Sequence, residues 1–134
     1  MFAAAADING DGKLDVVAVN SSNHVSVALG NGDGTFQPAV NYQVGEMPSA
    51  VAIADFDGDG TLDLAVSNLS LNAAGSLSFL AGKGDGTFRP AVTVDAGTFP
   101  SSTITGDFNS DGRTDLVLIN GYLSPALVLL STGH

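Results

Sequence analysis

The chain has 134 residues, a formal net charge of −10, a hydrophobic fraction of 44% and only 13% charged residues. This length suits one domain with a real core, and the high apolar fraction excludes a disordered acidic tail. Four Lys and Arg residues against fourteen Asp and Glu exclude a nucleic-acid interface, which needs clustered positive charge. Cysteine is absent, so disulfides and thiolate metal sites are excluded as well.

The start of the chain is apolar but does not fit a targeting segment. Residues 1–6 are too few for a signal peptide and carry no basic residue, so we expect the sequence to begin inside a longer protein. No run in the sequence approaches the roughly 18 apolar residues of a membrane-spanning helix. We therefore expect no membrane span.

Short apolar runs follow one another along the chain, each about as long as a β-strand. They show no helix caps and no apolar stripe with a period of 3.6 residues, so they indicate strands rather than helices. In chain order, the predicted strands are the run before Asp7 and residues 15–19, 25–29, 38–44, 49–54, 64–67, 77–81, 90–94, 102–105, 116–119 and 126–130.

An acidic pattern of nine residues joins pairs of these strands at 7–15, 55–63 and 107–115. Each copy reads D-x-[DN]-x-D-G-x-x-D, with oxygen-bearing side chains at alternate positions and Gly where the loop turns. Ca²⁺ takes six to eight oxygen ligands and is bound by loops of this kind. We predict ligands at positions one, three, five, seven (through the carbonyl) and nine: Asp7, Asn9, Asp11, Lys13 and Asp15; Asp55, Asp57, Asp59, Thr61 and Asp63; and Asp107, Asn109, Asp111, Arg113 and Asp115.

The acidic pattern has two other interpretations. The helix-loop-helix calcium motif ends in a bidentate Glu at position twelve, but here that position holds Ala18, Val66 and Leu118, which cannot bind metal. Plain hairpin turns favour the same Asp and Gly residues. Three copies in one register, each with Asp at position nine, favour a metal loop over a plain turn.

The spacing of the motifs reveals a repeat. Asp7 lies 48 residues before Asp55, which lies 52 residues before Asp107, and a second motif, G-x-G-D-G-T-F, occurs at 30–36 and 82–88. Periods of this size are typical of propellers and solenoids. We divide the single domain, residues 1–134, into repeats at about 1–48, 49–100 and 101–134, the last of them incomplete.

Four short strands per repeat match one blade of a β-propeller. Pro38 and Pro90 open the fourth strand and cannot donate a ladder hydrogen bond, so we place that strand at the outer edge.

Because strand direction alternates, the acidic loops share one rim of the blades with the G-x-G-D-G-T-F turns. Loops of more variable length form the opposite rim. On or near that second rim, His24, Phe99 and Tyr122 are candidate ligand-binding residues, although half-buried rim residues would look the same.

Residues 49–66 followed by 80–88 resemble the FG-GAP or VCBS repeat of bacterial secreted proteins and, more distantly, the integrin α-chain propeller. The resemblance covers essentially the whole chain. It implies an all-β propeller, usually of seven blades, with about three Ca²⁺ ions per chain between the first and second strands of the blades. It further implies an extracellular or cell-surface, bacterial location and roles in adhesion, carbohydrate binding or support of attached enzymes.

About two and three-quarter blades cannot close a ring. We therefore expect either a segment of a longer propeller or a homo-oligomer that associates through its open edges. The second acidic loop is expected to bind Ca²⁺ most tightly because it has four carboxylates, whereas Lys13 and Arg113 add positive charge to the others.

No catalytic site is predicted. Most carboxylates belong to the acidic loops, and Ca²⁺ activates water poorly compared with Zn²⁺. The favoured function is a non-catalytic, calcium-stabilised module that binds a glycan or a protein outside the cell. The alternative is a structural segment of a larger secreted enzyme.

Overall fold

The computed structural model describes residues 3–70, 74–97, 100–120 and 127–130, and these residues form strands and loops without any helix. Accordingly, the described residues include no helix long and apolar enough to cross a membrane. The strands are β1 (Ala3–Ala6), β2 (Asp15–Asn20), β3 (His24–Ala28), β4 (Val40–Gln43), β5 (Pro48–Ala54), β6 (Asp63–Asn68), β7 (Gly75–Leu80), β8 (Val92–Gly97), β9 (Pro100–Gly106), β10 (Asp115–Asn120) and β11 (Leu127–Leu129).

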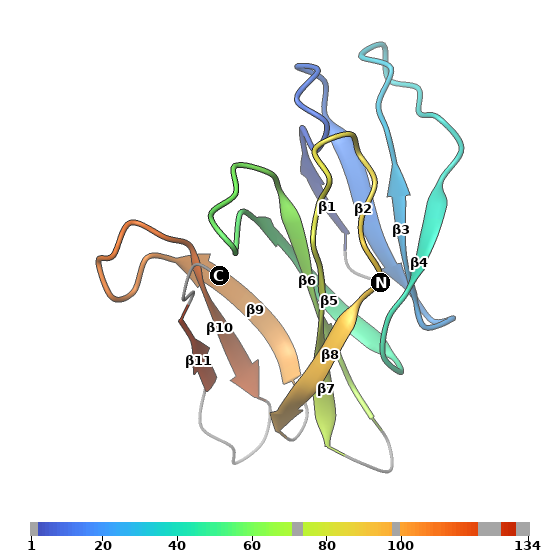
Figure 1. The fold of residues 1–134 in the computed structure, drawn as a ribbon. Coiled ribbons are helices and arrows are strands. Elements are labelled where there is room, and N and C mark those ends of the chain that lie inside the picture. Colours follow the sequence, from blue (N-terminus) through green and yellow to red (C-terminus); the bar gives the residue numbers. More distant parts are fainter. Residues whose placement is uncertain (1–2, 71–73, 98–99, 121–126, 131–134) are drawn as a thin grey trace.

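Three antiparallel sheets, one from each predicted repeat, stand side by side (Figure 1). The first sheet has the order β1-β2-β3-β4, the second β5-β6-β7-β8, and the third, in the described residues, β9-β10-β11. Strand β5 contacts both β1 and β9, so the first strands of the three sheets line one side of the assembly. This architecture confirms the predicted all-β fold built from propeller blades.

The fourth strands β4 and β8 lie at the outer edges, as predicted, but they begin later than expected. Backbone pairing brings Gln37 N to Leu29 O at 2.8 Å and Arg89 N to Ala81 O at 2.8 Å, just before Pro38 and Pro90. Proline has no N–H to continue the ladder. The strands therefore start two residues after the prolines, at Val40 and Val92.

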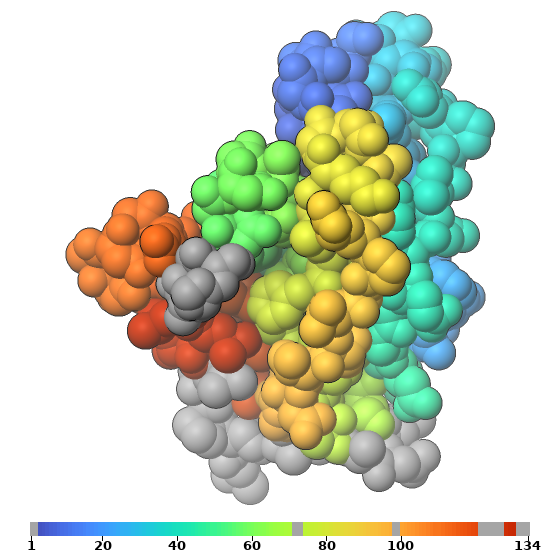
Figure 2. Space-filling model, in the orientation of Figure 1, coloured from blue at the N-terminus to red at the C-terminus, as the bar shows by residue number. Residues whose placement is uncertain are grey.

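The second sheet is covered on both faces, and this decides where the core lies. Every residue of β6 is buried, whereas β2 alternates between buried and half-buried side chains. One apolar cluster, which includes Val17 and Leu64, lies between the first and second sheets. Another, which includes Ala65 and Leu116, lies between the second and third. Figure 2 shows the first and third sheets at opposite ends of the molecule.

Candidate metal centre

The acidic loops fold around their own first aspartate. In the second loop, Asp55 Oδ1 accepts the N–H groups of Gly58 (2.7 Å) and Asp59 (3.1 Å), and Asp55 Oδ2 accepts the N–H of Gly60 (2.9 Å). Gly58 and Gly60 have φ angles of 78° and 89°, a left-handed backbone that favours glycine. The position of Gly in the motif thus follows from the tight winding of the loop.

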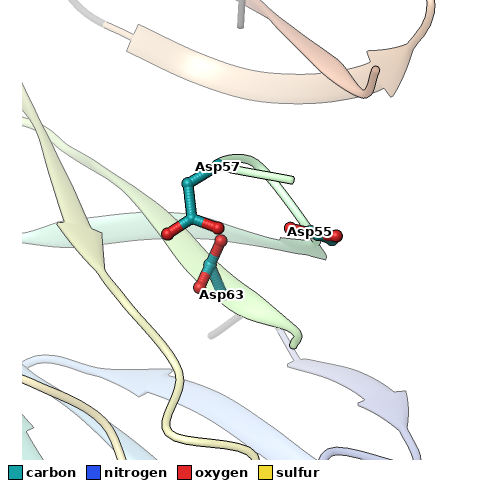
Figure 3. Close-up of side chains that lie close together, drawn as sticks. All are labelled: Asp55, Asp57 and Asp63. Carbon is teal, nitrogen blue, oxygen red and sulfur yellow. The ribbon is translucent and has the colours of Figure 1, made fainter. Parts of the chain in front are cut away.

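Three carboxylates converge in this loop (Figure 3). Asp55, Asp57 and Asp63 each offer one oxygen, and these three oxygens all lie within 4.8 Å of one another. Opposite ligands of a Ca²⁺ ion are about 5 Å apart, because Ca–O distances are about 2.3–2.6 Å. The spacing and the all-oxygen donor set therefore fit Ca²⁺ and do not suit a soft metal.

The predicted fifth-position ligand, Asp59, lies outside this group of three. Its Oδ1 accepts the N–H of Thr61 at 2.8 Å and the hydroxyl of Thr61 at 2.6 Å. These hydrogen bonds favour the charged form and lower the pKa of Asp59. Three of the four predicted carboxylates are thus brought together, and the fourth faces the seventh-position residue.

Charge repulsion is concentrated on Asp57. Desolvation raises the pKa of Asp57, and the nearby charges of Asp63, Asp59 and Asp55 raise it further, against the N–H of Asp59 that lowers it. Two carboxylates about 5 Å apart repel by roughly 3 kcal/mol at an effective dielectric constant near 20. A cation at this place would remove that repulsion.

The ninth-position aspartates have a second role that the sequence did not reveal. Asp15 and Asp63 are 0% and 4% exposed, and each accepts two backbone N–H groups. Asp63 Oδ2 accepts from Phe56 N at 2.9 Å, and Asp63 Oδ1 accepts from Gly82 N at 2.8 Å. Asp15 bonds in the same way to Ile8 N and Gly30 N. One side chain therefore ties the acidic loop to the neighbouring G-x-G-D-G-T-F turn.

The same contact explains the first glycine of that turn. A Cβ atom at Gly82 would lie 2.1 Å from the carbonyl oxygen of Leu62, and one at Gly30 would lie 2.1 Å from that of Leu14. No side chain fits at such a distance. The recurring Gly thus reflects close packing of the turn against the acidic loop, and it confirms that both lie on one rim.

The first and third loops repeat this winding with Asn at position three. In the first loop, Asn9 Oδ1 accepts the N–H of Asp11 at 3.2 Å, and Asp7 accepts from Asp11 N and Gly12 N. The Nζ of Lys13 lies 3.9 Å from Asp11 Oδ2, so a cation already faces this carboxylate. The third loop has the same hydrogen bonds from Asp111, Gly112 and Arg113 N–H groups to Asp107, Asn109 and Asp111 oxygens, and Asp115 is 1% exposed.

The comparison with protein families decides the identity of the repeat. The model of the FG-GAP-like repeat matches residues 7–66 and again 69–118. The chain belongs to the FG-GAP-like repeat family. The first match spans β2 to β5 and the second spans β7 to β9, and the matched ranges contain all three acidic loops. No curated protein matches the chain.

The residues predicted to bind a ligand are not brought together by the described part of this FG-GAP-like chain. His24 begins β3 at the second rim, and its ring Nδ1 lies 2.5 Å from Ser22 O. Phe99 and Tyr122 lie outside the described residues. The structure shows instead a cavity of about 390 Å³ at this rim, between the first and second sheets, lined by Val19, Asn20, Ser21, Met47, Pro48, Ser49 and Leu69.

A second hollow lies between the outer strands β4 and β8 and has a volume of about 570 Å³. Tyr42 and Phe88 form part of its wall, with their rings 5.5 Å apart and nearly perpendicular, and Phe88 N donates to the Tyr42 hydroxyl at 3.3 Å. Sequence reasoning missed this groove because its walls come from two different repeats. The Gly-Thr-Phe turn that carries Phe88 was the available signal.

Proposed function

We propose that the chain is a non-catalytic FG-GAP-like module whose acidic loops bind Ca²⁺, and that it recognises a glycan or a protein outside the cell. The observation that carries the proposal is the convergence of Asp55, Asp57 and Asp63 within 4.8 Å. When bound, Ca²⁺ would neutralise repelling carboxylates and fix the acidic rim. The residues that would hold it are those predicted from the three loops, and the second loop would bind most tightly.

The role of the metal is structural in this proposal. The ninth-position aspartate belongs both to the proposed ligand set and to the hydrogen bonds that hold the neighbouring turn. Metal binding would therefore stabilise the rim and, through it, the packing of the sheets. A ligand that binds only the folded state at 100 times its dissociation constant adds about 2.7 kcal/mol to the free energy of unfolding.

The recognition role rests on the division of the molecule into two rims. The acidic loops occupy one rim, and the 390 Å³ cavity lies at the other, where backbone groups tie neighbouring loops together. There, Met47 N donates to Asn23 Oδ1 at 3.1 Å and Leu69 N donates to Met47 O at 2.9 Å. Loops on a rigid scaffold are common recognition sites. FG-GAP-like repeats typically occur in extracellular or surface proteins, which agrees with this location.

The test of metal binding is a calorimetric titration of the chelator-treated chain with Ca²⁺, followed by thermal melts with and without the ion. We expect binding and a higher melting temperature in Ca²⁺. Asp57→Ala should weaken binding at the second loop about tenfold or more, because one carboxylate of three is lost.

A matched control is Asp85→Ala. Asp85 is an exposed aspartate bonded to Thr87, and it lies in the Gly-Thr-Phe turn, outside the acidic loop. It should leave the titration unchanged. Equal loss in both variants, or identical melts in Ca²⁺ and chelator, would contradict the metal role. Recognition is tested separately on a glycan array with the calcium-loaded chain, where specific binding supports it and silence favours a structural segment of a larger protein.

A further inference from the structure

The first acidic loop contains an Asn-Gly step that the third loop lacks. Position three of the pattern is Asn9 in the first loop and Asn109 in the third, and the next residue is Gly10 in one and Ser110 in the other. Asparagine is thermally labile, because its side chain loses ammonia when the backbone nitrogen of the following residue attacks the amide carbon. Glycine, which has no Cβ, leaves that nitrogen least hindered. The two loops therefore present the same side chain with different neighbours.

Gly10 is open to this reaction. It has a φ angle of 72°, and a Cβ atom at this position would meet nothing within 4 Å. In the second loop the corresponding N–H, that of Gly58, donates to Asp55 Oδ1 at 2.7 Å. In the first loop the N–H groups of Asp11 and Gly12 make the bonds to the first aspartate, and the Gly10 nitrogen donates to none of the residues that the structure describes. That nitrogen is thus available for the attack.

Asp11 holds the side chain of Asn9 at both of its polar atoms. Asn9 Oδ1 accepts the N–H of Asp11 at 3.2 Å, and Asn9 Nδ2 donates to Asp11 Oδ2 at 3.4 Å. Negative charge develops on Oδ1 during the attack, and a backbone N–H at that atom stabilises it as in an oxyanion hole. The Asp11 carboxylate lies beside the nitrogen that must be protonated before it leaves. Both contacts therefore favour the loss of ammonia.

Asn109 has the same two contacts but a different neighbour. Its Oδ1 accepts from Asp111 N at 3.0 Å, and its Nδ2 donates to Asp111 Oδ2 at 3.0 Å. Ser110 also has a left-handed backbone, with a φ angle of 62°. The side chain of Ser110 crowds the attacking nitrogen, whereas Gly10 has none. The third loop is thus a matched control within the same chain.

The other Asn-Gly step of the described residues, Asn31-Gly32, lies in the first G-x-G-D-G-T-F turn. There Asn31 Nδ2 donates to Thr35 Oγ1 at 2.9 Å, and Asn31 N donates to Thr35 O at 2.9 Å. These bonds hold the amide through its nitrogen, and within the described part of the chain no backbone N–H reaches Asn31 Oδ1. This step has the reactive glycine without the contact that stabilises the developing charge.

We propose that Asn9 is a site of spontaneous deamidation. The Gly10 nitrogen gives its proton to solvent and forms a bond to Asn9 Cγ; the Cγ–Nδ2 bond breaks, and Nδ2 takes up a proton and leaves as ammonia. Water then opens the succinimide ring that joins the two residues. Attack at the side-chain carbonyl yields aspartate, and attack at the backbone carbonyl yields isoaspartate. The reaction consumes water and releases ammonia, with no oxidation or reduction.

The two products change the first loop in different ways. Aspartate gives position three the carboxylate that Asp57 supplies in the second loop. Isoaspartate adds a methylene group to the backbone and breaks the alternate spacing of the oxygen-bearing side chains. Any consequence for Ca²⁺ affinity rests on the proposed function, whereas the reaction itself does not. The experiment therefore follows the reaction in chelator, so that its outcome is independent of metal binding.

The test is incubation of the full chain in chelator at mildly alkaline pH, followed by peptide mapping with mass spectrometry that distinguishes isoaspartate from aspartate. We expect the products to accumulate at Asn9 at least several times faster than at Asn31 or Asn109. The Asn9→Asp chain is the standard for one product, and circular dichroism confirms that the chain stays folded. Equal rates at Asn9 and Asn109, or a faster reaction at Asn31, would overturn the proposal.

Exchanging the neighbours of the two loop asparagines tests the cause. Gly10→Ser reproduces the step that the third loop already accommodates, and it should slow the reaction at Asn9 to the rate at Asn109. Ser110→Gly should raise the rate at Asn109 to that at Asn9. Asn31 serves as an internal reference that neither change should affect. An Asn9 rate that Gly10→Ser leaves unchanged would contradict the attack by the Gly10 nitrogen.

Unfolding the chain tests the contribution of the loop structure. In urea the hydrogen bonds from Asp11 to the Asn9 side chain are lost, so the rates at Asn9 and Asn31 should converge. The difference between Asn9 and Asn109 should persist, because it depends on the next residue in the sequence. A difference between Asn9 and Asn31 that is equally large in urea would contradict the role assigned to Asp11.

Discussion

Two carboxylates of the second acidic loop lie in different environments. Asp63, the last residue of the second loop, is 4% exposed and accepts two backbone N–H groups from separate segments. Asp57, six residues earlier, is half-buried, and its Oδ1 accepts an N–H from within the loop, that of Asp59 at 3.0 Å. Both carboxylates belong to the proposed metal site, but Asp63 also holds separate segments of the fold together.

The largest expected effect is that of Asp63→Ala. It removes the acceptor of Phe56 N–H and Gly82 N–H in a buried place, and breaking a buried charged contact costs about 3–5 kcal/mol. Urea unfolding in chelator measures the change. Asp57→Ala is the matched control, which should change the free energy of unfolding little in chelator. Equal losses in the two variants would mean that Asp63 has no structural role beyond that of Asp57.

Gly82→Ala should have the next largest effect. The new Cβ would lie 2.1 Å from Leu62 O, so the backbone of the turn or of the acidic loop must move, at a cost of about 2–3 kcal/mol. Chemical unfolding measures this loss. Lys83→Ala, at the exposed next position, should be nearly neutral, and a neutral Gly82→Ala would show that the turn does not need its close contact with the loop.

Asn9→Asp tests why the first and second loops should differ in Ca²⁺ affinity. It gives the first loop the carboxylate that Asp57 supplies in the second, and greater ligand charge should raise Ca²⁺ affinity by about tenfold. Calorimetric titration measures the change. Asn31→Asp adds the same charge in the Gly-Thr-Phe turn, outside the loop, and should not change affinity at this site. A similar gain from both would mean that general charge, not ligation, sets the affinity.

The smallest expected effect concerns Asp85. The hydroxyl of Thr87, and then its N–H, lower the pKa of Asp85. Because the folded pKa is below the unfolded one, the charged form stabilises the turn above the usual value of 3.8, and this is lost as pH falls through the lowered pKa. An NMR titration should show the Asp85 pKa rising in Thr87→Val, with little change in melting temperature. An unchanged pKa would contradict this cause.

The strands and the acidic loops could be predicted from the sequence alone. Alternating apolar runs predicted the strands, and the nine-residue acidic pattern predicted the loops between the first and second strands of each sheet. Both signals are local: a strand alternates its side chains between two faces, and Gly at a left-handed position is required within the loop itself. The outer position of β4 and β8 also followed from Pro38 and Pro90, although the strand starts did not.

Tertiary structure alone decided which faces are covered. The strand 116–119 reads Leu-Val-Leu-Ile and is fully apolar, yet Ile119 is exposed, whereas Ser67 in the equivalent strand β6 is buried. Side-chain type could not reveal this, because burial depends on whether a neighbouring sheet lies on each face. The second role of Asp63 was equally hidden, since its partner Gly82 is 19 residues away and meets it only when the sheet is formed.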